Sequence, residues 1–295
     1  MLKRIIDGNL LLALFIIVWG AWVRASGSGA GCGEHWPLCN GEVLPPDPTL
    51  KTITELLHRV TSGIFGITVF AAFIMARRRE RHAERTPGSR ALTRALLGCL
   101  AFTITEALIG AVLVKKGLVV DNDSALRAGV ISIHLINTLG LLYFLVQSAL
   151  SVRAPHSALR PLSWDKDKLF YLCLGLFMIV GASGAIAALG NTLFPETDLI
   201  EGIKKDFSSA SHYLIQLRVL HPLAALSLAG TLFYFVDEPH PPWSKWLLIG
   251  VGVAVGWGVL NWALLAPTWG ALTHLFIADC LFMLFIGYQF QRRSS

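Results

Sequence analysis

Long apolar runs separated by short polar segments recur along the whole chain. Each run is close to the roughly 20 residues that a helix needs to cross a bilayer, and charges or proline and glycine clusters bound it. The pattern predicts eight transmembrane helices, at about 9–24, 54–76, 94–114, 128–151, 169–190, 213–236, 246–266 and 269–290. The last two share one uncharged stretch, in which Pro267 and Gly270 predict a tight hairpin.

Composition agrees with a membrane protein. Of the 295 residues, 54% are hydrophobic and 15% are charged, whereas a soluble domain carries about 25% charged residues. A soluble enzyme with one buried core is therefore excluded. The net charge of +6 does not indicate nucleic acid, because no basic stretch is interleaved with aromatic residues. We interpret the first apolar run as an uncleaved span and not as a signal peptide.

The distribution of basic residues predicts the orientation. With the N-terminus in the cytoplasm, sixteen lysines and arginines fall on the cytoplasmic side and seven on the outer side, as the positive-inside rule requires. Both termini are then cytoplasmic, and a bacterial plasma membrane is the simplest location. The polar loop that holds Cys32 and Cys39 faces the oxidising side, where a disulfide can form and persist.

The two halves of the chain, residues 1–152 and 153–295, resemble each other. The second span of each half holds a related segment, Glu55-Leu-Leu-His58 in one and Arg218-Val-Leu-His221 in the other. The fourth spans align His134-Leu-Ile with His274-Leu-Phe. The sequence therefore predicts an all-α membrane protein of eight transmembrane helices, arranged as two parallel-repeated four-helix bundles.

Four histidines lie at matched depths in these spans. Each follows a polar or proline residue just outside or at the start of its span by seven to nine positions, namely Lys51, Arg127, His212 and Pro267, which places it roughly 10 Å below the outer edge of its helix. Two imidazoles from facing helices can bind one haem iron from opposite sides, whereas two histidines per half leave a zinc site incomplete. The alternative is that these histidines form structural hydrogen bonds between helices.

The halves differ three residues before the histidine of their second span. Glu55 occupies this place in the first half and Arg218 in the second. A carboxylate beside an iron site can move protons, whereas an arginine can pair with a haem propionate. The hypothesis is that the first half does chemistry and the second holds a permanent cofactor. Glu55 also has a simpler interpretation, as a first-turn acid that the helix dipole favours.

Other polar groups are less informative. Arg59 can pair with Glu55 or with a propionate, and Glu106 and Asp279 receive no role. A disulfide in the cysteine loop could tether a lid over the first pocket or exchange electrons with a partner thiol. The structural role is the more common one for paired extracellular cysteines.

Together these residues resemble the haem A synthase family, which converts haem O to haem A for haem-copper oxidases. The resemblance covers essentially the whole chain. It rests on GAWVRASGSG at 20–29, CGEHWPLCNG at 32–41 with Pro45 and Pro46, Glu55-Leu-Leu-His58-Arg59, His134, Asn191 with Phe194 and Pro195, His221 and His274.

The resemblance implies a role for each half. The C-terminal half would bind haem b through His221 and His274. The N-terminal half would receive haem O through His58 and His134, with Glu55 and His58 acting in catalysis. Two hydroxylations of the C8 methyl group and loss of water would then give the formyl group. The remaining implied features are a Cys32–Cys39 disulfide and propionate or pocket contacts from Arg24, Arg59, Arg127 and Arg218.

Expected partners are the protoheme farnesyltransferase, haem-copper oxidase assembly and the lipid bilayer; a homo-oligomer is left open. The chain departs from the family where Pro222 follows His221 and where Glu106 replaces an expected glutamine. Two competing functions remain. One is a dihaem b-type electron-transfer protein that oxidises quinol, and the other is a transporter with a histidine proton relay, which parallel repeats do not favour.

Overall fold

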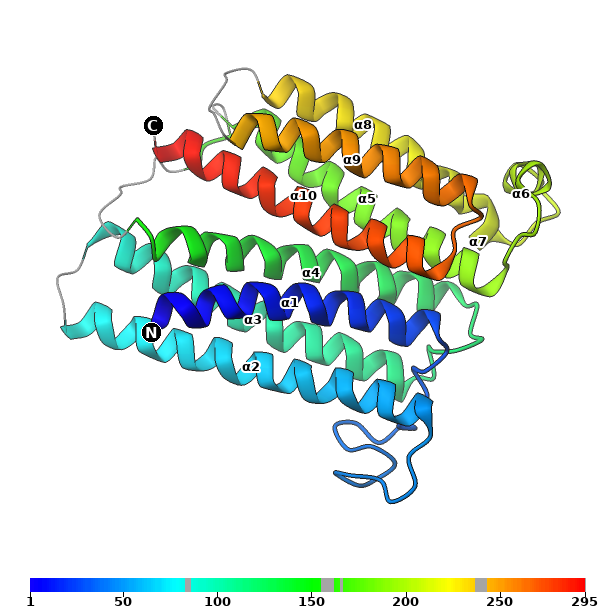
Figure 1. Cartoon of the computed structure of the whole chain (residues 1–295), viewed down its shortest axis with the longest axis horizontal. Coiled ribbons are helices and arrows are strands. Elements are labelled where there is room, and N and C mark those ends of the chain that lie inside the picture. Colours follow the sequence, from blue (N-terminus) through cyan, green and yellow to red (C-terminus); the bar gives the residue numbers. More distant parts are fainter. Residues whose placement is uncertain (83–85, 155–161, 165–166, 237–242, 295) are drawn as a thin grey trace. The chain divides into compact units, whose positions relative to one another are not determined.

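The structure is a computed structural model that describes residues 1–82, 86–154, 162–164, 167–236 and 243–294. Its described part is helical apart from one isolated bridge between Cys39 and Glu42. Eight of its helical spans are long and apolar enough to cross a membrane, so the predicted number of spans is confirmed. The helices in chain order (Figure 1) are α1 (Leu2–Ala25), α2 (Leu50–His82), α3 (Pro87–Lys115), α4 (Ala125–Ser151), α5 (Lys168–Leu193), α6 (Leu199–Asp206), α7 (Tyr213–Gln216), the 3-10 turn η1 (Leu217–Val219), α8 (Leu220–Phe235), α9 (Trp243–Ala263) and α10 (Thr268–Ser294).

Several helices continue past the apolar runs that predicted them. The first begins at Leu2, and α2 extends through its arginine-rich end to His82. Arginine and glutamate are good helix formers, so a helix does not end where its hydrophobic run ends. Arg85, Arg160 and Lys166, which entered the count of cytoplasmic charges, lie outside the described residues.

The sixth span is interrupted near its N-terminal end. Residues 213–236 are predicted as one helix, yet η1 separates α7 from α8. Pro222 lacks the backbone N–H that would bond the carbonyl of Arg218 and crowds that carbonyl. A short 3-10 turn at Leu217–Val219 accommodates the missing bond.

The hairpin between the last two spans has the predicted position. The turn begins after Ala263 and ends before Thr268. It is made by Leu265 and Ala266, whose φ angles are 63° and 51°, a conformation that glycine usually supplies.

One short helix was not predicted. The segment after α5 contains α6, whose N-cap Asp198 accepts a hydrogen bond from the backbone N–H of Glu201 at 2.8 Å. Aspartate followed three residues later by glutamate resembles a helix-start signal, so the sequence did carry the evidence.

Two compact units are described separately. Unit 1 comprises Met1–Val120, Asn137–Pro161 and Phe285–Ser295. In it α2 packs against both α1 and α3. One part of its core is a cluster of small and aliphatic side chains, formed by Leu2, Ile6, Ala72, Ala76, Leu92, Leu96 and Ala149.

Unit 2 comprises Asp121–Ile136 and Leu162–Leu284. In it α8 packs against α5 and α9. An aromatic pair contributes to its core, since Phe177 and Phe282 meet edge to face with ring centroids 5.1 Å apart. A second part of the core is a buried aliphatic cluster of Ala128, Leu189 and Leu214.

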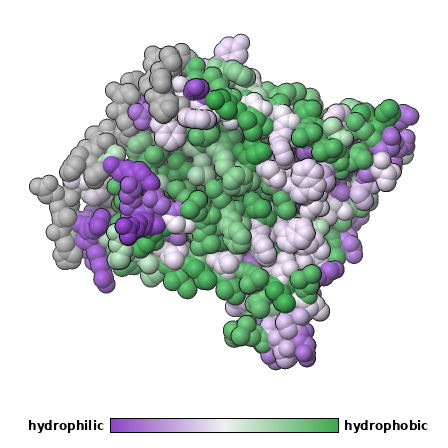
Figure 2. Space-filling model, in the orientation of Figure 1, coloured by the Kyte–Doolittle hydropathy of each residue, from purple (hydrophilic) through white to green (hydrophobic). Residues whose placement is uncertain are grey.

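The flanks of the helices are apolar and exposed. In α2, Ile67 is 70% exposed, and in α8 Leu226 is 60% exposed. Figure 2 shows apolar side chains along the helices and hydrophilic ones mainly at their ends. Apolar surface on this scale suits contact with lipid, and the chain is a multi-pass membrane protein.

Candidate functional site

In unit 1 the carboxylate of Glu55 fastens α2 to the cysteine loop. Glu55 is buried, with 3% of its surface exposed. Its Oε2 accepts a hydrogen bond from the backbone N–H of Cys32 at 2.8 Å, and its Oε1 accepts one from Arg59 at 2.6 Å. Since Arg59 lies one turn further along the same helix, the two side chains form an i,i+4 ion pair.

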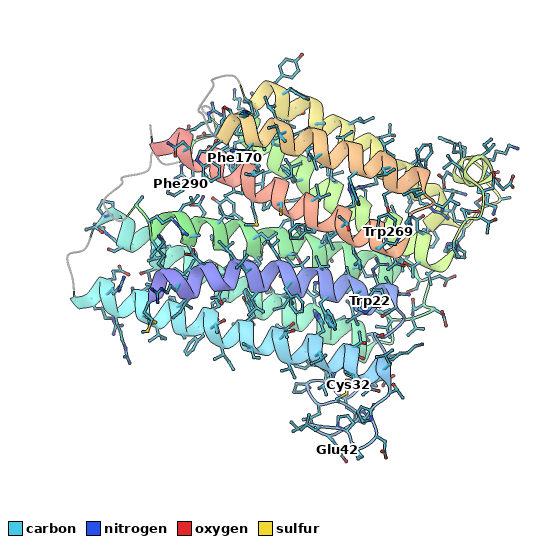
Figure 3. All side chains as sticks on the ribbon, viewed as in Figure 1. Trp22, Cys32, Glu42, Phe170, Trp269 and Phe290 are labelled. Atoms are coloured by element: carbon cyan, nitrogen blue, oxygen red, sulfur yellow. A yellow bond between two sulfur atoms is a disulfide. The ribbon has the colours of Figure 1, made fainter. Side chains whose placement is uncertain are left out.

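Arg59 binds the other end of the same loop. Its second terminal nitrogen donates to the backbone oxygen of Leu38 at 2.6 Å and to that of His35 at 3.3 Å. The Cys32–Cys39 disulfide closes the loop, which confirms the pairing that the family resemblance implied. Figure 3 shows Cys32 where the loop meets α2 and Glu42 at its far tip. The Glu55–Arg59 pair therefore holds both ends of the disulfide loop to the start of α2.

His58 lies one turn along α2 from Glu55, against a glycine of α1. A Cβ atom built on Gly20 would be 2.9 Å from Cε1 of His58, a distance that real side chains do not allow. The Nε1 of Trp19 donates to the backbone oxygen of Thr54 at 3.0 Å and adds a second link between α1 and α2. His58 belongs to unit 1 and His134 to unit 2, so their pairing stays a prediction from the sequence.

In unit 2 the structure brings His221 and His274 together. Their ring centroids are 6.0 Å apart and their planes are nearly perpendicular, at 83°. The Nδ1 of His221 is 3.2 Å from the backbone oxygen of Val180 on α5. A carbonyl oxygen only accepts, so Nδ1 carries the proton and Nε2 presents its lone pair. A histidine that binds a metal is commonly oriented in this way.

Glycines also make room for these two rings. A Cβ atom on Gly184 of α5 would be 3.0 Å from Cε1 of His221, and one on Gly258 of α9 would be 3.1 Å from Cε1 of His274. Each of the three histidines with such a contact, His58 included, therefore occupies a notch in a neighbouring helix. In each case the missing side chain of the glycine lets the imidazole lie close to the backbone of the neighbouring helix.

The pair in unit 2 fits a haem iron better than a zinc ion. Metal–nitrogen bonds in proteins are about 2 Å long, so two imidazoles on opposite sides of one ion have centroids about 6 Å apart, which agrees with the observed spacing. The buried Nδ1 of His274 has no hydrogen-bond partner within the described ranges. No group of three or more potential metal ligands occurs there either. Two nitrogen ligands are what a haem, which supplies four of its own, requires.

Arg218 performs in unit 2 a task similar to that of Glu55 in unit 1. It donates to the backbone oxygen of Phe194 at 3.1 Å. It also lies 3.6 Å from a carboxylate oxygen of Glu196 and 3.9 Å from one of Asp206. Only 10% of its side chain is exposed. Arg218 thus fastens the segment that follows α5 to the start of the sixth span.

Lys205 completes the charged cluster of Arg218, Glu196 and Asp206. Lys205 bonds Glu196 at 2.7 Å, and this hydrogen bond raises the pKa of Lys205 above its usual range. Burial raises the pKa of Asp206, Arg218 lowers it in part, and the charge of Glu196 adds to the increase. The cluster is therefore ionic, in contrast to the covalently closed loop of unit 1.

The remaining predicted residues have defined surroundings. Arg127 is 2% exposed and donates to the backbone oxygen of Asn122 at 2.6 Å, and Arg24 is half-buried. Glu106 accepts hydrogen bonds from Asn137 and Thr138 of α4, so it links two helices of unit 1.

Asp279 is buried in α10. Its Oδ2 has no hydrogen-bond partner in the described part of the chain. None of its contacts assigns it a role.

Sequence reasoning missed the glycine notches and the partners of Arg218. Gly20 stood within a motif that carried the family resemblance, but nothing indicated that it faces His58. Gly184 and Gly258 are two among 27 glycines, so spacing alone could not select them.

Comparison with known proteins gives consistent results. The sequence matches the COX15-CtaA family, described as cytochrome oxidase assembly protein, over residues 3–286. A Thermus thermophilus protein named protoheme IX farnesyltransferase is 38% identical over 293 residues, which cover 95% of this chain and 46% of that protein. A heme A synthase of Bacillus cereus and one of Bacillus anthracis are each 41% identical over 104 residues, or 35% of this chain and 32% of theirs. The chain spans less than half the length of these curated relatives.

Proposed function

Because the chain belongs to the COX15-CtaA family of cytochrome oxidase assembly proteins, we propose that it is a haem A synthase. It oxidises the C8 methyl group of haem O to a formyl group. The observation that carries the proposal is the His221–His274 pair, with centroids 6.0 Å apart in two glycine notches. The similarity to heme A synthases of Bacillus supports the reaction.

The C-terminal half binds the resident cofactor. His221 and His274 hold haem b, which supplies electron transfer when bound. Val180 orients the His221 ring through Nδ1, and Gly184 and Gly258 set how near the rings come to the neighbouring helices. Arg218, held by acidic side chains, keeps the outer segment in place near this pair. From the same position it would be available to pair with a propionate of the haem.

The N-terminal half receives haem O as substrate. His58 and His134 are its ligands, and the matched place of all four histidines in their spans supports this assignment. Each lies six to nine residues after the first residue of its helical span, which corresponds to about 9–14 Å of helix. Arg24 near the end of α1 and Arg127 near the start of α4 would be the basic residues available to its propionates.

Glu55 is the catalytic acid–base group beside this site. Its carboxylate can accept and return a proton, and Arg59 holds the carboxylate in position at 2.6 Å. Because the same oxygens fasten the cysteine loop, the loop covers the substrate pocket while Glu55 is in place. The hydrogen bond from Cys32 to Oε2 supports this coupling.

The cysteine loop faces the outer side of a bacterial plasma membrane, with both termini in the cytoplasm. The excess of basic residues on the other side of the spans supports this orientation. The supplier of the substrate is a protoheme farnesyltransferase, and the product enters haem-copper oxidase assembly. The Thermus relative supports the first partnership, because the match covers 95% of this chain but only 46% of a protein that bears the farnesyltransferase name.

Haem analysis tests the function. The chain is expressed in a bacterial strain that makes haem O but no haem A, and the extracted membrane haems are separated by chromatography. A formyl haem, or its hydroxymethyl precursor, is expected. Haem O that stays unchanged beside haem b would contradict the synthase and favour a dihaem electron-transfer protein.

Three histidine variants test the division of labour. His58→Ala should stop conversion and leave haem b bound, whereas His221→Ala should remove haem b. His35→Ala is the matched control, since this exposed loop histidine should affect neither haem. Loss of haem b from His58→Ala would refute the assignment.

A further inference from the structure

Two cavities lie at the arginine-rich end of α2 in unit 1. The first, of about 340 Å³, is bordered by Arg77 of α2 and by Arg90 and Arg94 of α3. The second, also of about 340 Å³, shares Arg77 with the first and adds Arg78 and Arg81. Each volume lies within the range of small-ligand pockets, about 300–1,000 Å³.

The walls of these cavities are strongly basic. Their described lining includes five arginines and one acid, Glu80. Glu80 lies 3.5 Å from Arg77 and so offsets only one of the five charges. Arg90 and Arg94 are exposed at the mouth of the first cavity, where an anion can reach them from the water.

An apolar wall adjoins the basic one. Phe73 borders both cavities, and Leu97, which is 52% exposed, borders the first. Phe73 lies one turn from Arg77 on α2, and Leu97 lies one turn from Arg94 on α3. On both helices, therefore, the basic residue sits where the apolar span ends. A ligand that fits has a negative head and an apolar tail.

The choice of basic residue favours a phosphate group. All seven lysine or arginine positions between 77 and 94 are arginines. Lysine satisfies the positive-inside rule equally well, but the planar guanidinium fork matches phosphate oxygens in pairs. The N-terminus of α3, capped by Thr86, adds a favourable dipole for an anion.

We infer that these cavities bind the phosphodiester headgroup of an anionic phospholipid, whose acyl chains run along Phe73 and Leu97. Basic pockets between membrane helices commonly hold such headgroups. The site lies among residues that the proposed haem chemistry does not use. Its occupancy is therefore independent of that proposal.

Native mass spectrometry of the full chain in detergent tests the inference. Phosphatidylglycerol, zwitterionic phosphatidylcholine and inorganic phosphate are titrated separately. Phosphatidylglycerol should bind more tightly than either of the others. The Arg90→Gln/Arg94→Gln double variant should weaken its binding about 30-fold, because each basic residue contributes a factor of about five.

Arg4→Gln/Arg79→Gln is the matched control. It removes the same charge from two exposed arginines of unit 1 that border neither cavity, and it should leave phosphatidylglycerol binding unchanged. Circular dichroism checks that both variants are folded. An equal loss in the control would mean diffuse charge attraction and would overturn the site. Equal affinity for phosphatidylcholine, or displacement of the lipid by phosphate at the same concentration, would overturn the lipid assignment.

Discussion

The second span of each half places one charged residue three positions before its histidine, and the two residues have opposite charge. Glu55 in unit 1 accepts hydrogen bonds from the cysteine loop and from Arg59. Arg218 in unit 2 donates to the segment after α5 and pairs with Glu196 and Asp206. Both residues fasten an outer segment to the helix that carries the histidine. The comparison shows that the residue at this helix position anchors a neighbouring segment in both units. The two side chains differ in their chemistry, because one is a carboxylate and the other a guanidinium.

The outer segments themselves are held in different ways. In unit 1 a disulfide closes the loop and a buried ion pair anchors it. In unit 2 a set of charges without a disulfide takes that role, and its Arg218 is as little exposed as Arg59 of unit 1. A covalent loop keeps its shape when salt or pH changes, but an ionic cluster is screened and titrates. The disulfide loop of unit 1, the unit with the proposed chemistry, should therefore change less with salt and pH than the ionic segment of unit 2.

Exchanging the two charged residues for neutral ones gives the largest expected effect. Glu55→Gln should reduce haem A formation by about 10²- to 10⁴-fold, the usual contribution of a positioned acid–base group. Arg218→Gln should leave most of the turnover, because Arg218 contacts the segment after α5 and belongs to the half that does not hold the proposed substrate. The ratio of haem A to haem b in chromatographed extracts measures both. Full turnover in Glu55→Gln, with loss in Arg218→Gln and haem still bound, would reverse the roles of the halves.

Filling a glycine notch should disturb the cofactor next most strongly. Gly184→Val forces a branched side chain against the His221 ring, and such overpacking costs about 1–3 kcal/mol. Haem b content, read from the absorption spectrum of the purified protein, should fall. Gly175→Val is the control on the same helix, since a Cβ atom there meets nothing within 4 Å. The same haem loss in both variants would show that the notch has no special role.

Removing the disulfide should destabilise unit 1 and spare the cofactor site. The Cys32→Ser/Cys39→Ser double variant lacks the disulfide, which for a short loop contributes about 2–3 kcal/mol to the free energy of unfolding. A lower melting temperature and faster proteolysis of the loop are expected, with the haem b spectrum unchanged. Loss of haem b in this variant would contradict the separate roles of the two outer segments.

The smallest effect concerns pH. Burial raises the pKa of Asp206 above its ordinary 3.8, so the folded protein favours the protonated carboxyl. The contribution of this group to stability is therefore complete below the unfolded pKa and is lost as pH rises through the folded pKa. Asp206→Asn should raise stability near neutral pH by less than about 1 kcal/mol, because solvent screens a partly exposed group.

Thermal melts from acid to neutral pH measure this effect. The variant should show a flatter pH dependence than the wild type. Asp47→Asn, in an exposed loop position, is the control and should follow the wild type. A loss of stability in Asp206→Asn at neutral pH would mean that attraction to Arg218 outweighs burial.

Much of the fold could be predicted from the sequence because membrane spans are local properties. A run of apolar residues is excluded from water wherever it occurs, and the backbone inside a bilayer must close its own hydrogen bonds as a helix. This logic predicted the eight spans and the hairpin before Thr268. The interruption in the sixth span was missed although Pro222 signals it. The span was predicted from its apolar residues, and these continue without a gap across the point where the backbone hydrogen bonds change.

The candidate site was only partly predictable. The place of His58, His134, His221 and His274 along their spans follows from counting residues at a fixed rise per residue. The glycine notches do not, because each glycine lies on another helix at a sequence distance that no period fixes. Likewise Arg59 binds backbone oxygens, which every residue has and no sequence pattern distinguishes.

The sequence by itself determined the number of spans, the depth of the four histidines and the presence of a charged residue one turn before two of them. These features depend on hydrophobic transfer and helix geometry, which act over one segment at a time. Only the tertiary structure decided that the rings of His221 and His274 lie with centroids 6.0 Å apart and that Glu55 and Arg218 each bind a segment outside the long helices. Contacts of this kind depend on how separate helices pack, and a side chain with several acceptable partners takes the one that packing brings within reach.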